Sequence, residues 1–168
     1  MLGNHGRRRQ PAVAVVLALV LAVALLAEGA GPAGAAGRGP PAPVDRQAGL
    51  VLVRSALTAL DQANKTGNYT VLRDLGGPVF RANTDARLAE AFAGLRSQSV
   101  DLSPVLAVEP VFTLPPQRQA SGLLRAVGFV PDGARRLNFE IAWQAQDGVW
   151  RLYGVVVTVT DLAPAPRK

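Results

Sequence analysis

The chain has 168 residues, a formal net charge of +6, no cysteine and one histidine. That histidine, His5, lies in the N-terminal export segment described below, so the rest of the chain has neither imidazole nor thiol. Serine and cysteine triads and histidine-based zinc sites are therefore excluded from the folded part. No glycine-rich phosphate loop is present, and neither a metal nor a cofactor is expected.

Residues 1–35 have the layout of a secretory signal: a basic start at Arg7-Arg8-Arg9, an apolar run over 12–27 and a small-residue segment ending at Ala35. The apolar run is shorter than the roughly 20 residues that span a bilayer as a helix. We therefore expect cleavage after Ala35 and a periplasmic or secreted protein. The alternative is an uncleaved segment that anchors the protein in the inner membrane through residues 12–27.

Composition divides the remaining chain. Residues 36–47 form a flexible leader rich in proline and glycine, 48–162 an α+β domain, and 163–168 a flexible tail of similar chemistry. Arginines are scattered along the domain, apart from Arg135-Arg136, so no basic block faces nucleic acid. Membrane contact is expected only through the N-terminal segment, if it is uncleaved.

Hydrophobic spacing predicts a first helix. Its core stripe is Leu50, Val53, Leu57 and Leu60, and Gly67 is a left-handed cap at its end. On this pattern Asp61 and Lys65 lie on the solvent side and form a weak surface pair.

Three short elements are expected next. Asn68 caps a short second helix that stops at Gly76-Gly77-Pro78, and Val79-Phe80 starts a short strand. A third helix begins at a cap, Asn83 or Thr84, and buries Leu88, Phe92 and Leu95.

From residue 105 the period changes from helical to two, and Asp147-Gly148 is a strong type I′ hairpin signal. Pro131-Asp132-Gly133 marks the preceding turn, and Gly154 marks a bulge. The fold class expected is α+β, with N-terminal helices packed on a curved antiparallel sheet of about four long strands, preceded by the hydrophobic export helix. The expected strands are Val105–Leu114, Leu123–Val130, Arg136–Gln144 and Val149–Thr160.

Two segments carry a family resemblance. TGNYTVLRDLGGPVF, from Thr66 to Phe80, and DGVWRLYGVVV, from Asp147 to Val157, resemble the cone-shaped domains of the nuclear-transport-factor-like and ketosteroid-isomerase-like superfamily. Both segments are also similar to exported proteins of Gram-negative bacteria. The resemblance implies a cone whose interior holds a ligand or a catalytic acid, and the superfamily includes isomerases, hydrolases, dehydratases and non-enzymatic binding domains.

The candidate catalytic residues are Glu109, Glu140 and Tyr69. A strand carboxylate that faces an apolar interior keeps its proton more readily and can act as an acid. The alternative is that both glutamates lie in water or pair with Arg125 and Arg151, and the alternation of the third strand places Glu140 on its wetter face. The expected ligand-pocket residues are the large aromatic side chains Phe80, Phe92, Phe112, Trp143, Trp150 and Tyr153.

No complete catalytic set is visible, so the sequence favours a non-catalytic exported domain that binds a small apolar ligand or another protein of the cell envelope. A homodimer through the exposed sheet face is also expected, because Val155, Val156, Val157 and Val159 place apolar atoms on both faces of the last strand. The alternative function is an enzyme of isomerase, hydrolase or dehydratase type that uses a carboxylate or tyrosine in a cone pocket.

Overall fold

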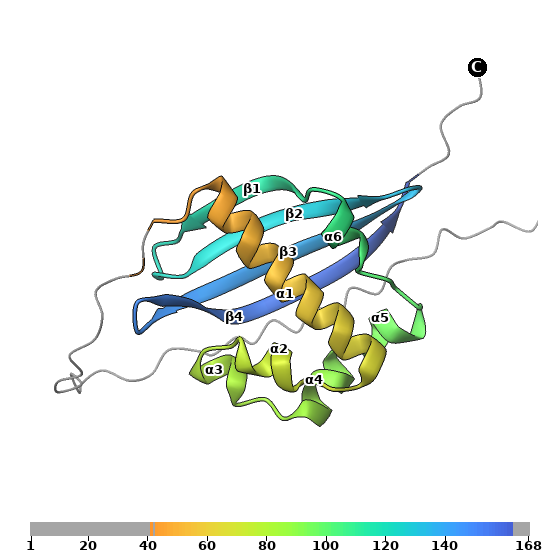
Figure 1. Cartoon of the computed structure of the whole chain (residues 1–168), viewed down its shortest axis with the longest axis horizontal. Coiled ribbons are helices and arrows are strands. Elements are labelled where there is room, and N and C mark those ends of the chain that lie inside the picture. The colour runs from red at the N-terminus through yellow and green to blue at the C-terminus, as the bar shows by residue number, and fades with distance from the viewer. Residues whose placement is uncertain (1–40, 42, 163–168) are drawn as a thin grey trace, which may run out of the picture.

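The computed structural model of the chain describes residue 41 and residues 43–162. The predictions of a signal or anchor over 1–35 and of a tail over 163–168, together with half of the leader, lie outside these residues. The described part is an α+β fold, as expected, in which helices pack against a four-stranded antiparallel sheet of order β1-β2-β3-β4 (Figure 1).

The first helix, α1, runs from Arg46 to Thr66, two residues before the predicted domain start. The Asp45 carboxylate accepts a hydrogen bond from Ala48 N, and Gly67 closes the helix at φ 75°, as predicted. The predicted core stripe is buried. The solvent placement of Asp61 is wrong, because this carboxylate is only 3% exposed and accepts a hydrogen bond from the backbone of Leu102.

Two short helices follow, α2 at Thr70–Asp74 and α3 at Pro78–Arg81. The predicted strand at Val79-Phe80 is wrong, since Pro78 occupies the first turn of α3, a position that suits its fixed φ and missing N–H. Strand-like pairing occurs just before it, where Leu152 N donates to Leu75 O and Gly77 N donates to Leu152 O. Asn68 Oδ1 accepts a hydrogen bond from Thr70 N, the first residue of α2, but the N-cap position itself is occupied by Tyr69, one residue later than predicted.

The third predicted helix is divided in two, α4 at Asp85–Ala91 and α5 at Ala93–Ser97. The Thr84 cap is confirmed, because its hydroxyl accepts from Arg87 N. Another short helix, α6, covers Pro104–Ala107, where a strand was expected to begin. Proline again starts the helix.

The sheet contains β1 at Val111–Arg118, β2 at Leu124–Asp132, β3 at Arg135–Gln146 and β4 at Val149–Asp161. The hairpin turn is confirmed by positive φ at both Asp147 and Gly148, 51° and 76°. The preceding turn lies later than predicted, since Pro131 and Asp132 still pair with β3. The bulge expected near Gly154 is present one residue earlier, at Tyr153, which has no partner in the β3–β4 register.

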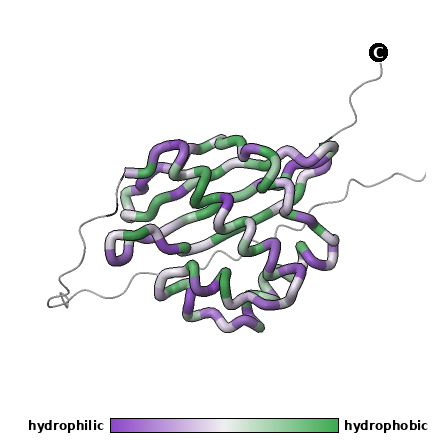
Figure 2. Tube along the Cα trace, in the orientation of Figure 1, coloured by the Kyte–Doolittle hydropathy of each residue, from purple (hydrophilic) through white to green (hydrophobic). Residues whose placement is uncertain are grey.

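The core lies between α1 and one face of the sheet. Alternate β3 residues are almost completely buried there, and α1 crosses in front of the strands (Figure 1). Apolar residues recur along the strands and along α1, while polar residues lie mainly at the turns and on the outer helices (Figure 2). The buried β3 residues are Leu137, Phe139, Ile141 and Trp143. Their neighbours in β3 therefore point to the opposite side of the sheet.

Candidate functional site

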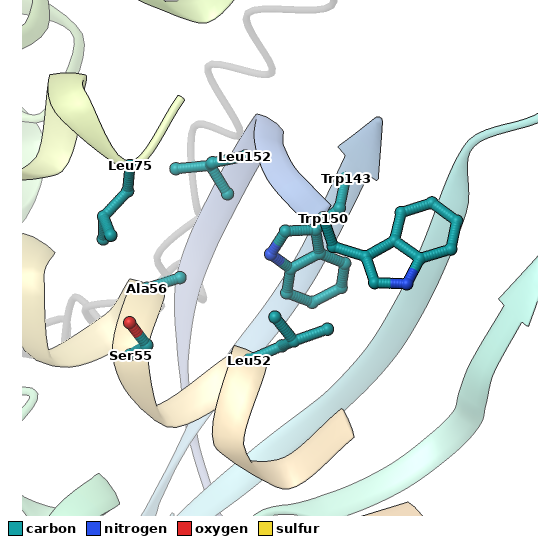
Figure 3. A pocket seen from close by; sticks show the side chains of 7 residues that line it. All are labelled: Leu52, Ser55, Ala56, Leu75, Trp143, Trp150 and Leu152. Carbon is teal, nitrogen blue, oxygen red and sulfur yellow. The ribbon is translucent and has the colours of Figure 1, made fainter. Parts of the chain in front are cut away.

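A small cavity lies between α1, the Leu75 segment and the β3–β4 hairpin (Figure 3). Its volume is about 40 Å³, which is room for a few water molecules at most. Trp143 and Trp150 form one wall, and Ser55 supplies the hydroxyl among the lining side chains. The other lining residues are Leu52, Ala56, Leu75 and Leu152.

The predicted pocket aromatics do not gather around one cavity. Trp143 and Trp150 line it, and the Arg118 guanidinium lies 5.2 Å from the centre of the Trp150 ring. Phe112 instead packs edge-on against Phe139, with ring centres 6.2 Å apart. The others are dispersed: Phe80 is buried in α3, Phe92 at the junction of α4 and α5, and Tyr153 is half-buried at the β4 bulge.

Neither candidate glutamate lies in the interior. Glu109 follows α6, is more than half exposed, and its Oε1 lies 2.6 Å from Arg46 Nη1. Glu140 is about half exposed, and its Oε1 accepts a 2.8 Å hydrogen bond from Arg125 Nε, which raises the pKa of Arg125. These positions agree with the solvated alternative, including the expected partner Arg125.

The third candidate, Tyr69, is completely buried outside the cavity. Its hydroxyl donates to Asn64 Oδ1 at 2.7 Å and accepts a hydrogen bond from Arg96 Nη1. Its ring stacks on Phe92 with centres 6.3 Å apart. The hydroxyl therefore has partners on both sides and joins α1, α2 and α5. The Asn64 Nδ2 group, in contrast, is buried without a hydrogen-bond partner.

The helices leave the other side of the sheet uncovered, and this side is named here the open sheet face. It consists of the β2 and β3 side chains that alternate with the buried ones, together with the β1 and β4 residues paired with them. The alternation of apolar and polar residues in β3 predicts this side, whereas the β1 residues that belong to it depend on the two register shifts in that strand. Its larger apolar members include Val111, Leu114, Val127, Phe129 and Val156.

The charged members of the open sheet face are three arginines and one glutamate. Arg125 pairs with Glu140, while Arg136 lies 4.5 Å over the Phe129 ring. Arg151 faces Gln144 across the β3–β4 register. Within the described residues, no carboxylate is at ion-pairing distance from Arg136 or Arg151. The face therefore has two uncompensated positive charges beside its apolar groups.

Among residues 41 and 43–162, no group of three or more Asp, Glu, His or Cys side chains is placed to hold a metal ion. The same residues contain no helix of the length and apolar character needed to span a membrane. Comparison with protein-family models, curated proteins and solved structures finds no match to this chain.

Proposed function

We propose that this chain is an exported, non-catalytic binding domain of the cell envelope, and that its open sheet face contacts another protein. The observation that carries the proposal is that apolar side chains and two uncompensated arginines share this face. Val111 and Val156 keep 42% and 37% of their surface in contact with solvent. Contiguous apolar groups with polar neighbours are typical of protein contact surfaces, and arginine is enriched in them.

The charge of the face indicates the chemistry of its partner. Three arginines against one glutamate suit a protein that presents Asp or Glu side chains. A homodimer across the same face would bring two positive surfaces together, which costs free energy. A different, acidic protein is therefore the better occupant of this face.

The small volume of the cavity beside Trp143 and Trp150 also favours a protein partner over a small ligand. Binding sites for drug-sized ligands have volumes of roughly 300–1,000 Å³, whereas this cavity has about 40 Å³. The exposed, arginine-paired positions of Glu109 and Glu140 also favour binding over the enzyme alternative. Export and the cone-shaped, nuclear-transport-factor-like architecture are part of the proposal, supported by the N-terminal sequence and by the order of helices and bulged strands.

The experiment compares two double variants in the bacterium that expresses the protein. Arg136→Glu with Arg151→Glu reverses the uncompensated charges of the open sheet face. The matched control, Arg81→Glu with Arg87→Glu, makes the same charge change on exposed residues of α3 and α4. Envelope proteins that copurify with the tagged chain are quantified at low and high salt.

We expect the face variant to lose its partner at least tenfold, the control to retain it, and high salt to weaken the unaltered complex. Equal recovery with both variants would contradict the proposal. The mass of the purified chain tests export separately, because cleavage after Ala35 gives a defined N-terminus.

A further inference from the structure

Strand β4 is an edge of the sheet, and one half of that edge is open. Its first half is covered where Leu152 exchanges backbone hydrogen bonds with Leu75 and Gly77. Val79-Phe80, which was expected to form a strand, lies in helix α3 instead. The backbone pairing with β4 is therefore limited to the single bridge at Leu152. From Val155 to Thr160, no strand of the described residues pairs with the outer edge of β4.

The two edges of the sheet differ in how they are protected. Edge strand β1 contains Pro115 and Pro116, has two register shifts and ends at Arg118. Such features prevent further strands from adding to an edge. The β4 segment from Gly154 to Thr160 has neither proline nor charge, and all its residues except the first are β-branched. It is therefore an unprotected template for another strand.

The sequence of this segment is complementary to itself. In an antiparallel pair centred on Val157, each Val155 faces the partner's Val159, each Val156 faces the partner's Thr158, and the two Val157 residues face each other. On the helix-covered side, Val155, Val157 and Val159 are half-buried at the margin of the core. The same valines of a second copy would cover their remaining surface.

We propose that two copies of this chain pair antiparallel through the free half of β4, about a two-fold axis at Val157. The two four-stranded sheets then form one continuous sheet of eight strands. Because the axis is perpendicular to the sheet, both open sheet faces lie on the same side. The dimer therefore presents one broad, positively charged surface. The pairing itself does not require that surface to bind anything, so it is tested independently of the proposed function.

The first test is a charge exchange on solvent-facing positions of the pair. Val156→Lys with Thr158→Lys places lysines opposite lysines only in the dimer, and Val156→Glu with Thr158→Glu places carboxylates opposite carboxylates there. Val156 is already 37% exposed, and both positions belong to the open sheet face. Because Val156 pairs with Glu140 within one chain, the glutamate variant also brings two carboxylates together in the monomer, and urea unfolding of both variants controls for this effect. We expect each variant alone to dimerise about tenfold more weakly than the unaltered chain. An equimolar mixture should recover dimers, measured by light scattering.

The second test uses the absence of cysteine in the chain. Residues that face each other in antiparallel strands have Cα atoms about 4.5–5.5 Å apart, within the range that a disulfide bridges. Val157→Cys should therefore yield a covalent dimer on mild oxidation. Val111→Cys, an exposed position on the protected edge β1, is the control and should remain monomeric.

The proposal is overturned if the unaltered mature protein, purified after export, is a monomer at high concentration. It is also overturned if Val111→Cys cross-links as readily as Val157→Cys, or if Arg136→Glu with Arg151→Glu abolishes the dimer while the lysine variant does not. The last result would assign the dimer to the open sheet face. Unchanged partner capture by the Arg136→Glu with Arg151→Glu variant, with an intact dimer, would contradict the proposed function alone.

Discussion

Replacing Asp61 by alanine should destabilise the domain mainly through one backbone amide. Asp61 Oδ1 accepts a 3.1 Å hydrogen bond from Leu102 N, and both residues are buried. Asp61 Oδ2 also lies 2.8 Å from Lys65 Nζ. A buried N–H left without a partner costs about 1–3 kcal/mol, whereas the ion pair with the solvent-accessible Lys65 is screened by water and contributes less. We expect a loss of about 2–3 kcal/mol in the free energy of unfolding.

The control is Asp101→Ala, which removes the other carboxylate on the same lysine. Asp101 is about half exposed and lies 2.8 Å from Lys65 Nζ. This variant should lose less than about 1 kcal/mol, because the groups it leaves behind are accessible to water. Urea unfolding measures both losses, and hydrogen exchange should show faster exchange of the Leu102 amide in Asp61→Ala alone. Equal losses in the two variants, or a loss in Asp61→Ala that vanishes in high salt, would refute the reasoning.

Two further predictions concern pH and the sheet. Hydrogen bonds from Lys65 and Ser103 hold the pKa of Asp101 well below its ordinary value of 3.8. The stability that the ionised Asp101 contributes is therefore complete above pH 3.8 and is lost as the pH falls below that value. Asp101→Asn should reduce the dependence of the free energy of unfolding on pH in this acidic range, measured by urea unfolding, and an unchanged dependence would contradict the assignment. Gly128→Ala should destabilise β1–β2 pairing by about 1–3 kcal/mol or prevent folding, because a Cβ there would lie 2.2 Å from Val111 O; unchanged thermal unfolding would contradict it.

The sequence was sufficient for those elements in which local chemistry and tertiary packing agree. Periodicity and a terminal glycine located α1, a threonine cap located α4, and Asp147-Gly148 located the hairpin, because each signal acts within a few residues. The coarse α+β arrangement followed from the change of period after residue 105.

The two segments that were predicted as strand but form helix are each four residues long. Segments 78–81 and 104–107 each begin with proline and are too short to show helical periodicity. Their apolar residues therefore suit a strand equally well, and the choice depends on tertiary contacts. For α6, one such contact is the 3.2 Å hydrogen bond from Arg54 Nε to Val105 O.

The candidate site was predicted less well than the fold. Aromatic residues are visible in a sequence, but their distances depend on packing, so only Trp143 and Trp150 share the cavity. Asp61 was misplaced because its partner, the Leu102 amide, lies 41 residues away in the sequence. The alternation of apolar and polar residues identified the wetter side of β3. The open edge of β4 was not predicted, because the sequence suggested a strand at Val79-Phe80 where the structure has helix α3.

The hydrogen bonds that position α1 are made to the segment before β1, and the second half of β4 is less covered by the helices than β3 is. Three α1 side chains reach the segment between α5 and β1: Asp61 to the Leu102 amide, Arg54 to the Val105 carbonyl and Arg46 to Glu109. The helix begins beside β1 and crosses the strands diagonally towards the β4 side of the sheet (Figure 1). The inward residues of β3 are consequently buried, but those of β4 beyond its bulge remain half-exposed. Additional apolar cover over these valines would be stabilising, and the antiparallel pairing of a second β4 provides it without moving α1.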